Sequence, residues 1–212
     1  KRFLFDGYLM MDTEKLKKLV DELVQLPKEC EWVEFKLNFH SEDEIGKNIS
    51  AISNSACLNN QEFGYVVFGI EDKTHKIKGT NFNIKLATKG KEELESWLIN
   101  RLEPKIDFRT YAFEYSEGVQ LSIISIPTAE NRPIDFFHKP YIRIGSYTKE
   151  LNGYPEKEAK IWRKEPVKPL EIQTAKTNVS SDDVIQLLST QTYFELLKLP
   201  YPATSVGVIE KF

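Results

Sequence analysis

The sequence predicts a mixed α/β (α+β) fold in which helices pack on a mixed sheet, followed by a short helical extension at the C-terminal end. Three patterns support this. Apolar residues recur at helical spacing over residues 13–26. Residues 32–37 alternate between apolar and polar side chains, as in a half-buried strand. Residues 64–70 form an apolar run between turn residues, which is typical of a central strand covered on both faces.

The first part of the chain predicts a helix, a strand, a second helix and the central strand, in that order. Asp12 or Thr13 can cap the first helix, and Pro27 ends it. The alternating strand follows. Ser41 and Glu44 have the spacing of a capping box, which opens a second helix that ends near residue 58. Its apolar side comprises Ile45, Ile49, Ile52 and Ala56.

The rest of the chain adds hairpins and shorter helices. Residues 76–79 are expected to form a short strand, 80–90 a loop and 91–102 a third helix. Turn residues between apolar runs predict hairpins over 106–126 and 134–144, and Pro155 suits the first turn of a helix through Trp162. We therefore expect three segments: a domain over 1–165, a polar linker over 166–180, and a truncated helical extension over 181–212.

Composition limits the class of protein. The 212 residues are 41% hydrophobic and 29% charged, as is ordinary for a globular protein, and no apolar run approaches the ~20 residues of a membrane helix. The two cysteines, Cys30 and Cys57, are too few for a disulfide framework, so we expect a cytoplasmic protein. The net charge of −3 restricts nucleic-acid binding to a local basic face. Because the chain begins at a lysine, we expect a fragment, with Met10 or Met11 as the native start.

Three carboxylates stand at the ends of the first two predicted strands. Glu29 and Glu34 lie at the entry to the first strand, and Asp72 follows the end of the second. Hard oxygen ligands from two elements of one sheet suit Mg²⁺ or Mn²⁺ in phosphate chemistry. A straight strand would point Glu29 and Glu34 to opposite faces, so their convergence requires a turn after Glu29, which Pro27 favours.

The same acids have simpler explanations. Acidic residues at strand ends are commonly solvated or paired with lysines, and Glu31 or Glu71 could replace a chosen carboxylate. Other chemistries fit less well, because the sequence has no Walker-type phosphate loop and its histidines have no zinc-like spacing. His75 could donate a proton near Asp72 or could be a solvated turn residue.

A basic and aromatic stretch runs from residue 132 to residue 149. It contains five candidate nucleic-acid contacts: Arg132, Lys139, Tyr141, Arg143 and Lys149. If residues 141–144 form a strand, Tyr141 and Arg143 share one side of it, and we expect both to face solvent. An exposed arginine beside an aromatic ring suits phosphate contact and base stacking. A short hairpin with one arginine is also a common structural element.

Four ordered motifs resemble the Schlafen-type AlbA domain, a family associated with nucleic-acid binding. They are the acidic signature at 29–36, the helix segment 49–54 that ends in Asn54, the strand and turn at 68–72 with Lys78-Gly79, and the arginine-bearing hairpin at 141–146. Together they are far more specific than any one of them. The resemblance implies a nucleic-acid-binding α/β domain, and the segment from Ser181 resembles the start of a winged-helix extension.

Animal Schlafens with ribonuclease activity cut transfer and ribosomal RNA at a metal-dependent site of two glutamates and one aspartate. The resemblance places this site on Glu29, Glu34 and Asp72, with Mg²⁺ or Mn²⁺ as cofactor, and Lys36 could offset charge on the phosphate. The chain departs from that pattern at residues 56–60, which replace a frequent Gly-Gly. It also has one lobe where the animal enzymes use two, so a homodimer could supply the second wall of the cleft.

The sequence therefore predicts a metal-dependent endoribonuclease that acts on structured, tRNA-like RNA. The alternative is a non-catalytic DNA- or RNA-binding module of a transcriptional regulator or ATP-binding protein, since many bacterial relatives are described in those terms. A protein-interaction domain without a nucleic-acid role is a third interpretation, which the negative net charge keeps open.

Overall fold

The computed structural model describes residues 12–27, 30–39, 41–163, 185, 190–204 and 207–208. The chain divides into two compact units, Lys1–Pro166 and Val167–Phe212. The predicted linker lies outside the described residues. In the second unit, helix α6 (Thr190–Leu196) buries Phe194, whose ring packs edge-on against Tyr201 with 5.4 Å between centroids. None of the described helices combines the length and the apolar character that crossing a bilayer requires.

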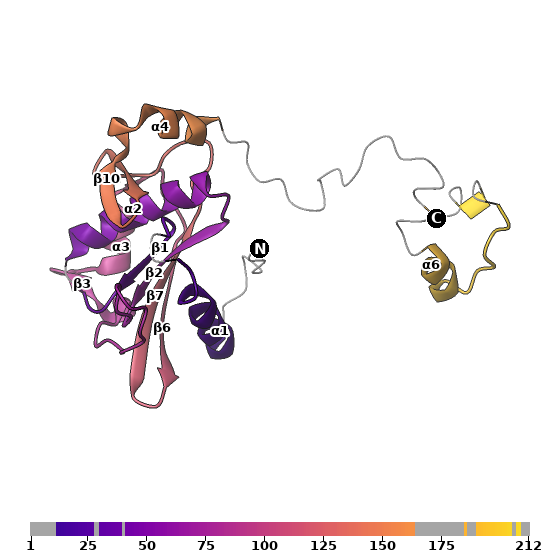
Figure 1. The fold of residues 1–212 in the computed structure, drawn as a ribbon, viewed down its shortest axis with the longest axis horizontal. Helices are drawn as coiled ribbons and strands as arrows, with labels where there is room; N and C mark the ends of the chain where they lie inside the picture. The colour runs from indigo at the N-terminus through magenta and orange to yellow at the C-terminus, as the bar shows by residue number, and fades with distance from the viewer. Residues whose placement is uncertain are drawn as a thin grey trace. The chain divides into compact units, whose positions relative to one another are not determined.

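The first two helices of the larger unit, α1 and α2 (Figure 1), each follow a predicted capping residue. Helix α1 (Thr13–Leu23) follows Asp12, whose Oδ1 accepts a hydrogen bond from a first-turn amide at 2.8 Å. Helix α2 (Glu42–Leu58) follows Ser41, whose Oγ accepts from the Glu44 amide at 3.2 Å. Both predicted helices are confirmed. The strands between and after them are β1 (Val33–Lys36) and β2 (Phe63–Phe68).

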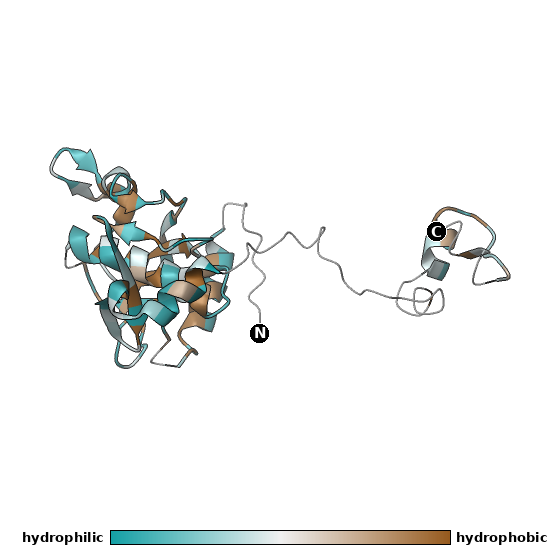
Figure 2. Cartoon of the chain, turned by 90° about the horizontal axis from the view of Figure 1, so that it is seen from above, coloured by the Kyte–Doolittle hydropathy of each residue, from teal (hydrophilic) through white to brown (hydrophobic). Residues whose placement is uncertain are grey.

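The central sheet has the strand order β1-β2-β7-β6 and is mixed, as predicted. β1 runs parallel to β2, whereas β7 (Val119–Pro127) is antiparallel to β2 and to β6 (Arg109–Ser116). α1 buries its apolar side against one face of the sheet, and α2 buries Ile49 and Ile52 against the other. Apolar segments accordingly concentrate in the interior of this unit (Figure 2).

A second sheet has the strand order β10-β9-β8-β5. Its strands are β5 (Leu102–Glu103), β8 (Asp135–Phe136), β9 (Lys139–Ile144) and β10 (Tyr147–Glu150). The predicted hairpin over 134–144 is confirmed, and a further hairpin turns at Gly145, whose φ of 56° glycine adopts at low cost. After a 3₁₀ helix, η2 (Leu151–Gly153), helix α4 (Pro155–Trp162) begins at the predicted proline.

Strand pairing shortens the third predicted helix at both ends. Residues Glu92–Glu93 (β4) pair with Thr88–Lys89 (β3), and β5 pairs with β8, so that α3 spans Leu94–Ile99. The predicted strand over 76–79 is reduced to a single bridge at Ile77. The predicted loop over 80–90 contains two short elements, the 3₁₀ helix η1 (Ile84–Leu86) and β3, so the prediction of a loop along its whole length is wrong.

Helix α2 contacts both sheets and bonds to the second one through polar side chains. β8 pairs with only the first two residues of β9, so the next backbone groups of β9 need other partners on that edge. Ser50 Oγ accepts from the Tyr141 amide at 3.0 Å, and Ser55 Oγ accepts from the Arg143 amide at 3.0 Å. Side chains of α2 thus take the place of a neighbouring strand.

The fully buried Asn54 makes three of these bonds. Its Nδ2 donates to the carbonyl oxygens of Ile134 at 2.9 Å and Tyr141 at 2.8 Å, and its Oδ1 accepts from the Ile134 amide at 2.8 Å. Ser50 Oγ donates to the same Ile134 carbonyl at 2.6 Å. One buried amide therefore fixes both β9 and the residue before β8 to α2.

Replacing Asn54 with alanine should destabilise the larger unit by roughly 2–4 kcal/mol, because three hydrogen bonds are lost and buried backbone groups are left unpaired. Urea denaturation followed by circular dichroism measures this free energy of unfolding. The control Asn100→Ala removes an exposed amide that bonds to Glu92 at 3.0 Å, and it should change the same quantity by less than about 0.5 kcal/mol. Equal losses in the two variants would contradict the role given to Asn54.

Candidate functional site

Glu34 lies in the middle of β1, and it is buried with 6% of its surface exposed. Its strand neighbours pack on the α1 side, so Glu34 points to the α2 side. Its Oε2 forms an ion pair with the Arg143 guanidinium from β9, and its Oε1 lies 3.0 Å from Lys36 Nζ. Lys36 Nζ also lies 2.7 Å from Glu44 Oε1 at the start of α2. We call these four residues the Glu34 cluster.

The cluster continues into β10. Arg143 is 5% exposed, and its Nη1 donates to Thr148 Oγ1 at 3.2 Å, which in turn donates to Asn48 Oδ1 at 3.1 Å. Burial alone would lower the pKa of Lys36, but its contacts with Glu44 and Glu34 outweigh burial and raise that pKa above the ordinary value. Each buried charge thus faces an opposite charge, which offsets the cost of removing it from water.

The expectation that Arg143 faces solvent beside Tyr141 is wrong. The two side chains do share one side of β9, but at Arg143 that side is turned toward β1, where the buried Glu34 carboxylate requires a cation. Tyr141 lies nearer the surface, with Lys47 Nζ 5.9 Å from its ring centroid. Arg143 is therefore placed to join the two sheets rather than to contact a phosphate.

The predicted metal ligands are not seen together in the described part of the chain. Glu29 lies outside it, and Asp72 is exposed in the turn after β2. Among the described residues, no group of three His, Cys, Asp or Glu side chains could hold a metal ion. Both oxygens of Glu34 face cations, so its arrangement does not fit a divalent ion. The Mg²⁺ or Mn²⁺ site remains a prediction.

The neighbouring candidates have contacts of their own. Glu31 Oε1 accepts a hydrogen bond at 3.2 Å from a backbone amide at the β9–β10 turn. Glu71 accepts from Lys78 Nζ at 2.6 Å, and this hydrogen bond lowers the pKa of the Glu71 carboxyl. The ring centroid of His75 lies 4.6 Å from that of Phe35, and His75 Nδ1 lies 3.1 Å from the carbonyl oxygen that follows α1. The first contact joins the segment before β1 to the β9–β10 turn, the second lies within the turn after β2, and the third holds that turn against β1 and the end of α1.

Cations lie over aromatic rings around α3 and the second sheet. Every such pair in the described chain involves these elements: Lys47 with Tyr141, Lys89 and Arg101 with Trp97, Arg101 with Phe137, and Lys149 with Tyr147. We call this group the cation–aromatic region. Tyr147 is 68% exposed, so one edge of the region is open to solvent.

Four of the five predicted nucleic-acid contacts lie in or beside this region. Lys139 Nζ lies 3.0 Å from a carboxylate oxygen of Glu150, which raises the pKa of Lys139, and Arg132 lies 3.8 Å from Glu103. The pairing of β9 with β10 places Lys139 on one face of the hairpin and Lys149 on the other. The predicted residues therefore surround the hairpin instead of forming one strip.

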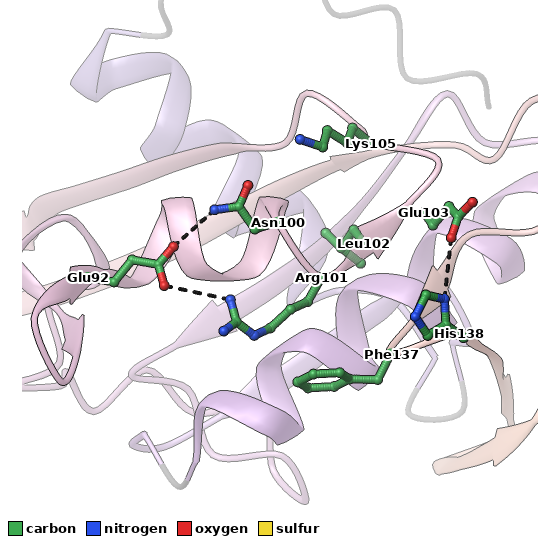
Figure 3. A pocket seen from close by; sticks show the side chains of 8 residues that line it. All are labelled: Glu92, Asn100, Arg101, Leu102, Glu103, Lys105, Phe137 and His138. Carbon is green, nitrogen blue, oxygen red and sulfur yellow. Dashed lines mark hydrogen bonds and ion pairs between the residues drawn. The ribbon is translucent and has the colours of Figure 1, made fainter.

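A pocket between α3, β5 and the β8–β9 turn was not predicted from the sequence (Figure 3). It is lined by Glu92, Asn100, Arg101, Leu102, Glu103, Lys105, Phe137 and His138. These side chains come from separate short elements, so no spacing links them. The available signal is Phe137-His138 in a two-residue hairpin turn, where Asn-Gly is the common pair.

Glu34→Ala should destabilise the larger unit by roughly 3–5 kcal/mol, because it leaves the buried Arg143 guanidinium without its carboxylate. The double variant Glu34→Leu/Arg143→Met should recover most of this loss, since it removes both charges and fills the space with apolar atoms. Urea denaturation of the wild type and both variants measures the effect. If Glu34→Ala has the same midpoint of urea unfolding as the wild type, the ion pair does not stabilise the larger unit.

Comparison with known proteins places these features in a family. The family model described as Schlafen, AlbA_2 matches residues 29–152, more than half of the chain. No curated protein matches. Among solved structures, the chain is similar to the DIP2311 protein from Corynebacterium diphtheriae, with 21% identity and a TM-score of 0.40 over 65% of this chain and 26% of that chain. The family match contains the Glu34 cluster, Asn54 and all strands of both sheets, and the chain belongs to the Schlafen AlbA_2 family.

Proposed function

We propose that this chain is a nucleic-acid-binding domain that holds unpaired segments of RNA or DNA on the cation–aromatic region. The observation that carries the proposal is the gathering of cation–aromatic pairs around α3 and the second sheet. Bases stack on aromatic rings and guanidinium planes, while neighbouring cations hold the phosphates. Membership of the family fits a nucleic-acid-binding role.

The open edge of the region is β10. Lys149 Nζ lies 5.6 Å from the centroid of the exposed Tyr147 ring, so this pair offers a cation and a stacking face at one point. Lys139 and Arg132 each have a carboxylate partner at the surface, and such exposed pairs are weak enough to exchange for a phosphate.

Charge reversal at β10 tests this proposal. Lys149→Glu should weaken binding of a fluorescein-labelled single-stranded oligonucleotide about three- to tenfold at low salt and lower the slope of log Kd against log salt by about one. Fluorescence anisotropy over a salt series measures both quantities. The matched control Lys18→Glu makes the same charge change on α1, on the opposite side of the central sheet, and should leave the slope nearly unchanged. Equal effects of the two variants would overturn the assignment to β10.

Metal-dependent cleavage of tRNA-like RNA is the second candidate function. It rests on the resemblance of the motifs at 29–36 and 68–72 to those of the animal ribonucleases, and the residues that the family model matches include Glu29, Glu34 and Asp72. Lys36 could contact a phosphate only if it left its two carboxylate partners. Likewise, Glu34 could bind a metal ion only if it left the two cations that it faces. Asp72 is the informative position, because it is exposed and its replacement leaves the Glu34 cluster intact.

If the domain is an endoribonuclease, total tRNA incubated with Mn²⁺ or Mg²⁺ should yield fragments that EDTA prevents. Asp72→Asn should then reduce cleavage at least about a hundredfold, because it removes one of the charged metal ligands. Its thermal stability should be unchanged, because the side chain is exposed and its replacement creates no cavity in the core. Lys73→Gln, the neighbouring exposed position, is the control. Cleavage is measured by gel electrophoresis of the RNA. Intact RNA in every sample, including the wild type with metal, would contradict the endoribonuclease proposal.

A further inference from the structure

The pocket beside α3 has the size of a small-molecule site. Its volume is about 740 Å³, and sites for small ligands commonly measure a few hundred to a thousand cubic ångströms. Figure 3 shows Glu92 at one end and Glu103 with His138 at the other, while Arg101 and Phe137 lie between them. The pocket therefore has an aromatic and cationic middle with a carboxylate at each end.

The middle of the pocket presents flat groups fixed in place. The Arg101 guanidinium carbon lies 4.2 Å from the Trp97 ring centroid and 5.8 Å from that of Phe137. Arg101 Nη1 donates to the Trp97 carbonyl at 2.9 Å, and the same nitrogen lies 3.7 Å from Glu92. Since Trp97 supports one face of the guanidinium, a planar ligand could stack on the exposed surface of the Arg101–Phe137 pair.

The turn that carries Phe137 is built at a conformational cost. Phe137 and His138 have φ values of 50° and 61°, in the left-handed region that bulky residues rarely adopt. Phe137 is nonetheless 50% exposed, and its amide donates to the Arg101 carbonyl at 3.1 Å. A turn of Asn and Gly would close this hairpin with less strain. A strained backbone that presents a half-exposed ring is typical of a binding site.

The ends of the pocket suit a ligand edge that donates hydrogen bonds. Glu92 Oε1 accepts from Asn100 Nδ2 at 3.0 Å, and Glu103 lies 3.4 Å from His138 Nδ1 and 3.8 Å from Arg132. Carboxylate oxygens have several acceptor positions each, so both retain capacity for further donors. The amino groups of bases are such donors, and glutamate accepts from them in base recognition.

We propose that this pocket binds one unstacked nucleobase that carries an exocyclic amino group, with its ring on Arg101 and Phe137 and its amino edge at Glu92. The proposal rests on the nucleic-acid binding proposed above and adds the place where a base is read. Arg132 at the Glu103 end and the neighbouring Lys139 would hold the attached phosphates. The base could belong to a strand or to a free nucleotide, because the pocket recognises chemistry that both share.

Titration of the full chain with two kinds of ligand distinguishes these sources. The first kind is the four ribonucleoside monophosphates, and the second is three pentanucleotides that contain only A, only C or only U. Isothermal titration calorimetry at low salt measures the binding of each ligand. Phe137→Leu keeps an apolar side chain but removes the stacking ring, and it should weaken binding about tenfold. Trp162→Leu removes a half-exposed ring on α4, outside the pocket, and should leave binding unchanged.

A second variant tests the reading of the base edge. Glu92→Gln keeps the shape of the side chain and replaces a double acceptor with an amide, so the preference for A, C or G over U should shrink. Thermal unfolding of each variant shows whether it is folded. In addition, 2-aminopurine at the centre of the A pentanucleotide should lose fluorescence on stacking in the wild type and lose less in Phe137→Leu.

Each outcome bears on one proposal or on both. If the strand binds and Phe137→Leu and Glu92→Gln bind as the wild type does, the pocket proposal is overturned and nucleic-acid binding stands. If nucleotides bind through Phe137 but strands do not, the pocket takes free nucleotides and nucleic-acid binding is overturned. If neither ligand binds the wild type, both proposals fail. Binding of U as strong as that of A and C would contradict the proposal that the pocket recognises an exocyclic amino group.

Discussion

The polar side of α2 holds the two sheets of the larger unit in one arrangement. A helix between two sheets can bury apolar side chains on both sides, yet α2 turns Ser50, Asn54 and Ser55 toward β9. Apolar contacts tolerate sliding, whereas these hydrogen bonds join specific backbone atoms in a buried setting where an unpaired group is costly. Displacing β9 by one residue would leave several donors and acceptors unpaired, so α2 sets the register of the second sheet.

The position of the buried ion pair follows from that register. Asn54 binds the carbonyl of Tyr141 and Ser55 the amide of Arg143, which brings the Arg143 guanidinium onto Glu34 of β1. A buried pair gains little net free energy, because removing both charges from water offsets their attraction. What it contributes here is a second, charge-specific connection between the central sheet and β9. Glu34 and Arg143 thus serve the packing of the domain, and any role in chemistry would have to operate through a change in these contacts.

Local signals predicted the elements whose formation depends on few neighbours. Asp12, Ser41 and Pro155 marked helix starts that the structure confirms, because a cap acts within one turn. The third helix was predicted too long because strand pairing at its two ends is set by residues distant in sequence. The exposure of Arg143 was predicted wrongly for the same reason. The alternation of apolar and polar residues predicts which side of the strand a side chain lies on, but not which distant residue, here Glu34, packs against that side. Glu29 lies outside the described residues, so the three-carboxylate site stays a prediction.

The net charge of −3 and a nucleic-acid-binding role are compatible because binding depends on local charge. At physiological salt, exposed charges more than about 8–10 Å apart are largely screened from one another, so distant acids on α1 or the 71–76 turn have little effect at β10. The rings of Tyr147 and Phe137 each add attraction for a base that does not depend on charge. The carboxylates of Glu103 and Glu150 partly neutralise the positive charge of Arg132 and Lys139. This lowers the non-specific attraction to the phosphates of a duplex and leaves base stacking unaffected. A domain built in this way would select exposed bases over paired ones, because only unpaired bases can offer their faces to the rings.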